Sequence, residues 1–502
     1  MRLRIFILLF LLNGCLNAQS YFNKRISQPY SDANASEYIV LNNDSVYLNI
    51  ISLNDSVNRL EQKFTSVSIQ NGKSTQLFNL VIDSTDYYAA KLTSCKNGGF
   101  ADAITIAKWG KQNTYGVIKY KPNGDTAFFN ISLDSLLYIY LYSIKETADK
   151  GFIISGKIQL IPGSQGGTED LVIIKTDSLG NEQWRKIYGL TDRREQGHSI
   201  ALCTDGGYII SGVKGKKAYV LKTDSLGNKI WDKTYGHPSW VNKPAYSIIQ
   251  TKEGGYAFVG ALAVKHFTGG DQVSPWLVKL NSLGDTLWTQ TNFGLGPGNS
   301  DHEYKDIIEL NDGSLMVCGE QYYWSPDTIN YPGPYRILGL ISKYDKNGNQ
   351  KWIRYYHHPE VIKAIGSFHV LNSIVQTPDG GFAAAGWLFP ETPDTGTQDT
   401  WVIKVDSFGC LVQGCEVTSV PEINTTISAL KIYPNPANDV LNINITPAEN
   451  QQEFVLELYD ILGKLVLTKT LYPQENTITV SHLKTGVYSY RIGEVWGQII
   501  VN

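Results

Sequence analysis

Four histidines and the carboxylates beside them are the side chains of this chain best suited to chemistry. The set comprises His302, His357, His358, His369, Asp301 and Glu303. A metal site needs ligands that converge, and no two of these residues have ligand spacing inside a regular element. Nothing around the two carboxylates separates a general acid from a general base. The sequence therefore predicts neither a metal site nor a catalytic set.

Other sequence signals of catalysis are also missing. The chain contains no GxSxG, HExxH, GxxxxGK[ST] or CxxC motif. Of its six cysteines, Cys410 and Cys415 are spaced to close a small loop as a disulfide in an oxidising compartment. The net charge of −3 gives no reason to expect nucleic acid as a partner. No cofactor is predicted.

The main structural feature of the sequence is a repeated β-hairpin, and this repeat must form the scaffold for any functional site. TDSLGNEQWRKIYG (Thr176–Gly189) returns as TDSLGNKIWDKTYG (Thr223–Gly236). In each copy a strand-like run leads into an Asp/Ser/Asn/Gly turn, and an aromatic residue follows the turn glycine by four positions. The same rule gives Trp184, Trp231, Trp288 and Trp352. Equivalent positions in successive units predict that these indoles are largely buried between units rather than exposed for ligand stacking.

A second turn precedes each hairpin, so the repeating unit has four strands. Five copies read DKGFIISG, DGGYIISG, EGGYAFVG, DGSLMVCG and DGGFAAAG, and KNGGFADAI is a degenerate sixth. Four-stranded units of roughly 50 to 65 residues are typical of a β-propeller. The segment from Ser36 to Asp83 has the length of a further unit, and the last unit lacks its fourth strand. We predict seven blades, with six or eight still possible, and closure of the ring by the strand-like segment after residue 20.

Loop length and content vary on only one face of such a propeller. The turns between strands one and two and between strands three and four are short and uniform, whereas the other connections differ from unit to unit. Variable loops on a rigid scaffold are where recognition usually occurs. Their aromatic residues form the predicted ligand-binding face: Trp240, Phe267, Tyr322, Tyr323, Trp324, Tyr331 and Tyr335.

The N-terminus has the pattern of a secretory signal peptide. MRLRIFILLFLLNGCLNAQS places two arginines before a short apolar run, with cleavage expected near Ala18 and Gln19. The run is too short to span a bilayer. An alternative is a lipoprotein signal, which would leave Cys15 as a lipidated N-terminus.

The C-terminal segment departs from the repeat and shows several ordered motifs. After a polar, Thr-rich stretch come YPNP with LNI, then LYD with GK, then LKTGVYSYRI. This order resembles the type A C-terminal sorting domain of the Bacteroidetes type IX secretion system. The motif residues are Tyr433, Pro434, Asn435, Pro436, Gly463, Lys464, Gly486 and Tyr488. The resemblance implies export across the outer membrane by the translocon, removal of the domain by a sortase, and a passenger that is anchored at the surface or released.

The predicted organisation is therefore an all-β chain in four parts. Residues 1–19 are the signal peptide, 20–415 the β-propeller passenger, 416–429 a linker, and 430–502 a small β-sandwich that sorts the cargo. For the passenger we favour non-catalytic binding of a glycan or a protein. The alternative is a polysaccharide-active hydrolase or lyase whose site lies on the variable-loop face, so enzymatic activity stays open.

Overall fold

The described residues are strands joined by turns and short connections. The computed structural model describes residues 21–26, 35–42, 44–54, 59–82, 86–89, 91–107, 113–132, 138–159, 169–189, 194–236, 244–265, 271–291, 302–324, 335–359, 367–389, 398–411, 427–434, 437–447, 453–460, 465–492 and 495–501. The chain forms two compact units, Met1–Val412 and Gln413–Asn502. The predicted signal peptide at 1–19 lies outside the described residues.

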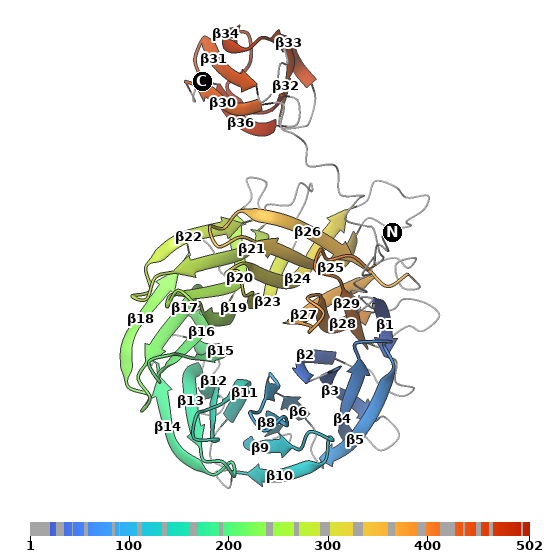
Figure 1. The fold of residues 1–502 in the computed structure, drawn as a ribbon. Helices are drawn as coiled ribbons and strands as arrows, with labels where there is room; N and C mark the ends of the chain where they lie inside the picture. Colours follow the sequence, from blue (N-terminus) through green and yellow to red (C-terminus); the bar gives the residue numbers. More distant parts are fainter. Residues whose placement is uncertain are drawn as a thin grey trace, which may run out of the picture. The chain divides into compact units, whose positions relative to one another are not determined.

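The first unit is a seven-bladed β-propeller, as the repeat predicted (Figure 1). The first three blades contain β2 (Ala35–Asn42), β3 (Ser45–Asn54), β4 (Arg59–Ser68) and β5 (Ser74–Ile82); β6 (Asp86–Ala89), β7 (Thr93–Ser94), β8 (Phe100–Ala107), β9 (Thr114–Tyr120) and β10 (Thr126–Ile131); and β11 (Tyr138–Glu146), β12 (Phe152–Gln159), β13 (Glu169–Thr176) and β14 (Glu182–Tyr188).

Blades four to six follow the same antiparallel order. They contain β15 (Glu195–Leu202), β16 (Tyr208–Lys214), β17 (Lys217–Thr223) and β18 (Lys229–Tyr235); β19 (Ala245–Gln250), β20 (Tyr256–Lys265), β21 (Asp271–Leu280) and β22 (Thr286–Thr291); and β23 (His302–Glu309), β24 (Leu315–Trp324), β25 (Tyr335–Tyr344) and β26 (Gln350–Tyr356). In each blade the first strand is innermost, so these first strands surround the axis.

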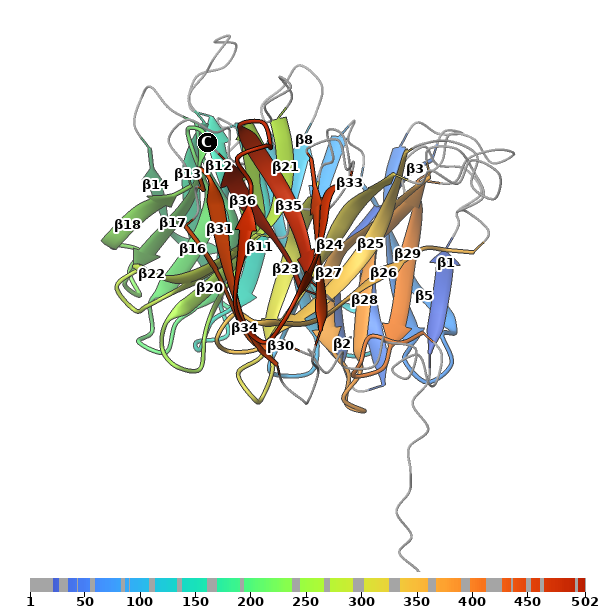
Figure 2. The same ribbon diagram turned by 90° about the horizontal axis from the view of Figure 1, so that it is seen from above.

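The seventh blade closes the ring with a strand from the other end of the chain. Its three C-terminal strands are β27 (Phe368–Gln376), β28 (Phe382–Phe389) and β29 (Asp399–Val405), and β1 (Phe22–Ile26) pairs antiparallel with β29 (Figure 2). The Arg25 guanidinium forms an ion pair with the buried carboxylate of Asp399. The predicted closure by the segment after residue 20 is therefore confirmed.

The repeated lysine before each hairpin turn has a structural function. In five blades its ammonium group pairs with the acidic residue of the preceding turn in the same blade, as in Lys175–Asp149 at 2.8 Å and Lys222–Asp205 at 2.8 Å. The second blade has Asn97 in place of that acid, and its Lys119 pairs with Glu146 of the next blade at 3.0 Å. A buried ammonium needs such a partner, so the acid and the lysine recur together.

The aromatic residue after each hairpin turn packs on the turn glycine of the following blade. A Cβ placed on Gly284 would lie 2.8 Å from the Trp231 ring, which leaves no room for a side chain. Seven contacts between a bulky apolar side chain and a turn glycine run around the ring, six from aromatic residues and one from Leu77, with Phe22 supplied by the closing strand: Phe22 on Gly72, Leu77 on Gly124, Phe128 on Gly180, Trp184 on Gly227, Trp231 on Gly284, Trp288 on Gly348 and Trp352 on Gly409. The four indoles are half-buried and contact the core clusters, so the prediction of largely buried rings was too strong. The reason is that they lie on the outermost strands.

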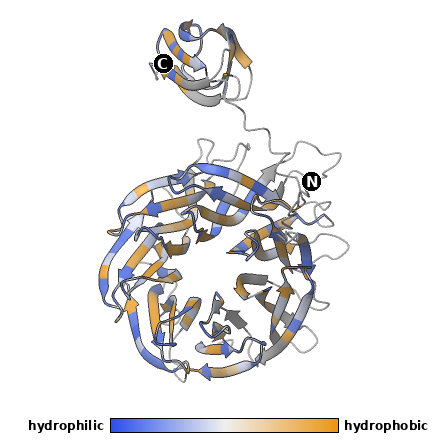
Figure 3. Ribbon diagram, viewed as in Figure 1, coloured by the Kyte–Doolittle hydropathy of each residue, from blue (hydrophilic) through white to orange (hydrophobic). Residues whose placement is uncertain are grey.

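Apolar side chains concentrate on the middle strands of each blade. The strands β13 and β17 are almost entirely buried, whereas β14 and β18 are mostly half-buried or exposed. The outer strands are correspondingly more hydrophilic (Figure 3). The core is therefore a set of layers between neighbouring blades, and it holds the inner strands at fixed positions around the axis.

The second unit is a small β-sandwich, as predicted. One sheet contains β30 (Ile427–Tyr433), β31 (Val440–Pro447) and β34 (Gln474–Thr479), and the other contains β33 (Leu465–Leu471), β32 (Phe454–Tyr459), β35 (Gly486–Ile492) and β36 (Val495–Val501). Buried and exposed residues alternate along β31 and β32, so each sheet presents one apolar face to a shared core.

Candidate functional site

The inner strands share one position that the fold brings to the axis. It lies six residues before the acidic residue of the next turn, or before Asn97 in the second blade. Four blades carry serine there, the sixth carries Asp306 and the second carries Lys91; the serines are Ser143, Ser199, Ser247 and Ser373. We call this set the inner ring. A β-bulge precedes the position in blades three to seven, which turns these side chains toward the neighbouring blade.

The serines of the inner ring connect neighbouring blades. Ser143 Oγ accepts a hydrogen bond from the Ile200 N–H at 3.3 Å, and Ser199 Oγ accepts one from the Ile248 N–H at 3.4 Å. The innermost strand has no partner strand on its axial side, so these hydroxyls satisfy backbone donors that the sheet leaves open. Serine at this position therefore has a structural explanation. Asp306 accepts the equivalent Ile374 N–H, but the charges of Asp306 and Lys91 do not follow from this role.

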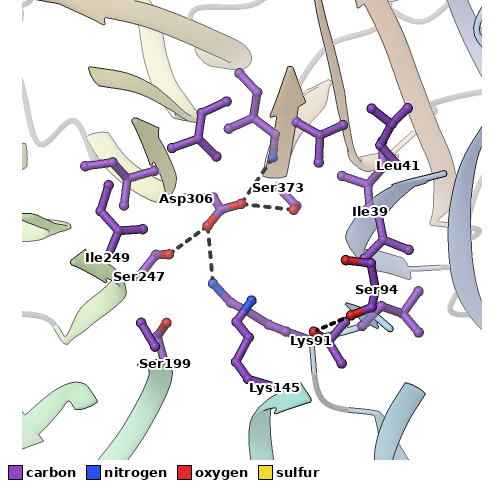
Figure 4. Close-up of a pocket in the computed structure, with 18 of the residues that line it drawn as sticks. Ile39, Leu41, Lys91, Ser94, Lys145, Ser199, Ser247, Ile249, Asp306 and Ser373 are labelled. Atoms are coloured by element: carbon purple, nitrogen blue, oxygen red, sulfur yellow. Dashed lines mark hydrogen bonds and ion pairs between the residues drawn. The ribbon is translucent and has the colours of Figure 1, made fainter. Parts of the chain in front are cut away.

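A cavity of about 350 Å³ lies where the inner strands surround the axis. Residues from all seven inner strands line it, and Figure 4 shows these side chains converging from the surrounding blades. Its polar members are mainly the inner ring, and its aliphatic members include Ile39, Leu41, Ile249, Ile308 and Val375. A ligand on the axis would therefore meet a polar level and an aliphatic level.

Asp306 is the most highly coordinated polar side chain of the cavity. Its carboxylate accepts hydrogen bonds from the Ser247 hydroxyl at 2.7 Å, the Ser373 hydroxyl at 3.0 Å and the Ile374 N–H at 3.2 Å. Lys91 Nζ, from the second blade, lies 3.5 Å from Asp306 Oδ1. The ion pair thus reaches across the axis and connects blades that are not neighbours. These contacts fix the position of the carboxylate in the cavity.

A second lysine enters the same cavity from the third blade. Figure 4 shows the Lys145 side chain beside Lys91, and both point toward Asp306. Burial lowers the pKa of Lys145, the charge of Lys91 lowers this pKa further, and the Asp306 carboxylate opposes both effects. Asp306 is the only carboxylate among the described residues that line the cavity. With both lysines protonated, the lining carries one positive charge in excess.

An aromatic ladder lies next to the inner ring, on the side where the inner strands begin. It consists of bulge residues of consecutive blades. Tyr142 stacks on His198 with ring centroids 4.8 Å apart, and His198 meets Tyr246 edge-to-face at 6.0 Å. Lys305 Nζ lies 4.6 Å from the centroid of the Tyr246 ring. All four side chains are half-buried, so they combine flat apolar faces with partial access to solvent.

His198 is held as a neutral ring. Its Nε2 lies 3.0 Å from Gln196 Oε1, and the Gln196 amide also donates to Glu169. Burial, together with the positive charges of Arg194, Lys91 and Lys157, lowers the pKa of His198 to about 3, although Glu169 opposes these effects. At neutral pH the imidazole is therefore uncharged, and its face is covered by Tyr142. This arrangement suits a rigid contact surface better than a proton donor.

The predicted aromatic face is only partly described. Tyr322, Tyr323 and Trp324 end β24, and Tyr335 begins β25, where Trp324 and Tyr335 are cross-strand partners. The structure thus brings these four positions together in the sixth blade, and the Tyr322 side chain is half-buried. Trp240, Phe267 and Tyr331 lie outside the described residues.

His302, His357, His358 and His369 do not form a metal site among the described residues. His302, His358 and His369 are buried, and the described part of the chain holds no group of three His, Cys, Asp or Glu side chains that could bind a metal. Asp301 lies outside the described residues. Burial lowers the pKa of His302 to about 4, so this ring is neutral at pH 7.

The cysteines offer no nucleophile in the described ranges. Cys95, Cys203 and Cys318 are free and buried, and burial raises the pKa of both Cys95 and Cys203 to about 12. Cys410 is disulfide-bonded. Its predicted partner, Cys415, lies outside the described residues.

The residues of the axial cavity were missed at the level of the sequence. Lys145 and Asp306 each lie in an apolar strand that looks like ordinary core, and Lys91 lies in an apolar run just before β7. The available signal was the repeat itself, because aligning the units on their turns shows Lys and Asp at a position that is otherwise serine. Their proximity follows only from closing seven blades into a ring.

Some residues of the predicted sorting motif are described within the second unit. Tyr433 ends β30 and is exposed, and Pro434 follows it. Gly486 begins β35, where the buried Tyr488 donates a hydrogen bond from its hydroxyl to the Lys484 carbonyl at 2.7 Å. Asn435, Pro436, Gly463 and Lys464 lie outside the described residues.

The C-terminal segment matches a known protein family. Residues 431–501 match the family described as "Secretion system C-terminal sorting domain". The chain is a cargo of the type IX secretion system, which exports it to the cell surface or the extracellular space. In the described residues no helix is long and apolar enough to cross a membrane. No curated protein matches the chain.

Solved structures resemble the chain only weakly. The GH93 α-L-arabinofuranosidase of Fusarium graminearum, in complex with arabinobiose, has a TM-score of 0.42 and 10% identity, covering 76% of this chain and 98% of the enzyme. A subtype N11 neuraminidase-like protein of A/flat-faced bat/Peru/033/2010 has a TM-score of 0.37 and 9% identity, covering 78% and 95%. A protein of unknown function from Bacteroides caccae has a TM-score of 0.34 and 11% identity, covering 59% and 90%. None of these similarities carries an argument about activity.

Proposed function

We propose that this secreted cargo is a non-catalytic binding protein, whose propeller holds a glycan or a protein ligand at its axis. The observation that carries the proposal is the chemistry of the axial cavity. Its lining brings two cations, serine hydroxyls and aliphatic walls together, next to an aromatic ladder. Such a combination of flat apolar surface and a few fixed polar groups is typical of binding sites.

The same cavity argues against hydrolysis by paired carboxylates. That mechanism needs an acid and a second carboxylate on either side of the scissile bond. The described lining supplies Asp306 alone, and this carboxylate already accepts three hydrogen bonds and pairs with Lys91. Because its oxygens are already occupied by these partners, Asp306 is assigned a structural and electrostatic role.

A lyase remains the second candidate because a tyrosine and a histidine meet near the axis. Lyases can use such a pair for proton transfer, which requires hydrogen-bond reach between the reacting groups and the substrate. In this chain Tyr142 and His198 contact each other through their ring faces, and His198 Nε2 contacts Gln196. This geometry favours a surface for ring stacking.

We further propose that the sorting domain brings the chain to the translocon and the sortase, and that the chain starts with a cleaved signal at residues 1–19. The passenger would then correspond to residues 20–415, a linker to 416–429 and the sorting domain to 430–502. This assignment places the propeller outside the cell, where extracellular glycans and proteins are available as ligands.

Binding arrays test the proposed function. The secreted protein should bind members of an array of polysaccharides and extracellular proteins, and Tyr246→Ala should weaken that binding about tenfold or more by removing one face of the ladder. Tyr472→Ala is the matched control, since Tyr472 is an exposed tyrosine of the second unit. Circular dichroism should first show that both variants are folded. Equal binding by all three proteins would place the ligand elsewhere, and products released by the wild type would favour the lyase or hydrolase.

A further inference from the structure

We infer that the axial cavity binds a carboxylate group, held by the Lys145 ammonium and the Ser199 hydroxyl beside the Lys91–Asp306 ion pair. The ligand is a small organic acid or the acid group of a sugar. This inference deepens the proposed function, and it rests on the proposal that the propeller binds its ligand without transforming it. The charge of the cavity, the position of Lys145 and the character of the walls each support it.

The lining of the cavity carries one positive charge in excess, which a bound anion would neutralise. Lys91 and Asp306 neutralise each other at 3.5 Å, and the Ser247 and Ser373 hydroxyls donate to Asp306. No carboxylate in the described lining remains for Lys145. Lys145 is half-buried and shares the Asp306 carboxylate with Lys91. A partly buried cation without a counter-charge of its own carries a desolvation cost, and a bound anion lowers that cost.

Lys145 occupies a position that does not otherwise carry charge. It lies four residues before the turn acid, where the other blades that share this turn have aliphatic residues or threonine. These residues are Thr93, Ala201, Ile249, Ile308 and Val375. Uncharged side chains are therefore sufficient for packing at this position of the propeller. Folding does not require a lysine here, so Lys145 is better explained by ligand binding.

The cavity also supplies a neutral donor on the blade next to Lys145. Ser199 Oγ accepts the Ile248 N–H at 3.4 Å, which leaves its hydroxyl proton available to a ligand oxygen. Figure 4 shows Ser199 on the inner strand that follows the strand of Lys145. An ammonium and a hydroxyl suit the two oxygens of one carboxylate.

The charge and walls of the cavity favour a carboxylate over inorganic phosphate. One excess positive charge matches a monoanion, whereas a dianion would leave a buried negative charge. The described lining contains no arginine, the residue that most often binds phosphate through two hydrogen bonds. The aliphatic residues at the level of Lys145 suit the carbon skeleton of an organic acid, and the volume of about 350 Å³ admits one of a few carbons or a single sugar acid.

Calorimetry and thermal unfolding of the secreted protein test the inference. The probes are butyrate and glucuronate, with glucose, inorganic phosphate and chloride as comparisons, in a buffer of low chloride content. The variant is Lys145→Met, which keeps the length and the apolar stem and removes the charge. Lys216→Met is the matched control, because Lys216 is an exposed lysine in the turn between β16 and β17.

Binding by the wild type and the control should exceed binding by Lys145→Met. We expect at least one of the two carboxylates to raise the unfolding temperature of the wild type, and to bind Lys145→Met at least tenfold more weakly, which is about 1.4 kcal/mol. Without ligand, Lys145→Met should be as stable as the wild type or more stable, since the unpaired charge is gone. Preference for glucuronate would identify a sugar acid as the source, and preference for butyrate an aliphatic acid.

Three results would overturn the inference. These are no binding of either carboxylate, equal affinity in the wild type and Lys145→Met, or tighter binding of phosphate or chloride than of both carboxylates. The arrays separate this failure from failure of the proposed function. If Lys145→Met still binds the array ligand of the wild type, the propeller is a binding protein whose ligand does not use the axial lysine.

Discussion

Single residues decide what the axis of the propeller can do. In the inner ring Ser143 and Ser199 accept backbone N–H groups of the next blade, Ser247 and Ser373 donate to Asp306, and two positions carry Lys91 and Asp306 in place of serine. The exchange is paired, because either charge alone would be buried without a partner. The third charge, Lys145, shares Asp306 with Lys91, so one positive charge remains in excess, and this excess is the reason to expect an anion.

The paired exchange predicts strong coupling between Lys91 and Asp306. Asp306→Ser should lower the free energy of unfolding by about 2–4 kcal/mol, because two lysines are then left in the cavity without a carboxylate. The double variant Lys91→Ser/Asp306→Ser restores the ring to serine and should recover most of that loss. Urea unfolding of both single variants and the double variant measures the coupling. Additive losses would show that the two side chains act independently.

The depressed pKa of His198 predicts a dependence of stability on pH. The folded-state pKa of about 3 lies below the unfolded value of 6.5, so the unfolded chain binds more protons between these values. Stability from this group is fully present above about pH 6.5 and is lost as the pH falls toward 3, at roughly 1.4 kcal/mol per unit.

Urea midpoints between pH 7 and pH 4 test this effect. The wild type should lose stability more steeply than His198→Gln, which keeps hydrogen-bonding capacity but does not titrate. His302 contributes a similar slope to both proteins, because burial lowers its pKa as well. Parallel curves for the two proteins would mean that His198 is not held neutral in the folded state.

At the level of elements, neighbouring blades are joined by a bulky apolar side chain and a turn glycine. Gly284 adopts φ +79°, a conformation that other residues rarely accept, and it also faces the Trp231 ring. Gly206 has a similar φ of +83° but nothing lies within 4 Å of the position of a Cβ. These two glycines separate the cost of the backbone conformation from the cost of the contact.

Substitution of the two glycines by alanine should therefore differ in effect. Gly206→Ala should cost about 1–2 kcal/mol, as expected for a left-handed conformation alone. Gly284→Ala should cost about 1–3 kcal/mol more, because Trp231 must move away. Chemical denaturation measures both, and Trp231→Ala should cancel part of the extra loss when combined with Gly284→Ala. Equal costs for the two single variants would contradict the interlocking of blades through this contact.

The sequence predicted the elements better than the site. The two turns recur in each unit, so the four-stranded unit could be inferred from the repeat, and seven blades could be favoured over six or eight. The closing strand could be inferred from the missing fourth strand of the last unit and the strand-like segment after residue 20. The degree of burial of Trp184 and its equivalents could not, because burial depends on how far the outermost strand faces solvent. The axial charges were hidden for a related reason: Lys91, Lys145 and Asp306 are distant in sequence, and only ring closure makes them neighbours.

At the level of the whole molecule, the chain combines a sorting domain, which directs its export, with a propeller that provides a rigid framework. The sorting domain matches its family over residues 431–501 and determines where the protein goes, while the propeller provides a rigid ring around one axial cavity. The two units are each compact, and the second has a hydrophobic core of its own. Export and ligand binding should therefore be separable by mutation.

Removal of the sorting domain tests that separation. A chain without Leu430–Asn502 should accumulate in the periplasm, because the address is lost, while its propeller still folds. Cell fractionation with immunoblotting measures the location, and limited proteolysis of the retained protein measures folding. The substitution Tyr472→Ala in the full chain is a suitable control for export. Normal surface display of the truncated chain would contradict the role of the domain.

The proposed function is that the propeller binds its ligand and does not convert it chemically, whereas an enzyme would release a product. It can be tested by a long incubation of the secreted protein with the ligand identified on the arrays, followed by NMR of both the bound and the recovered ligand. We predict saturable binding that depends on Tyr246, and a recovered ligand identical to the starting material. New reducing ends or unsaturated sugars, formed by the wild type and abolished by His198→Gln, would contradict the proposed function and identify an enzyme.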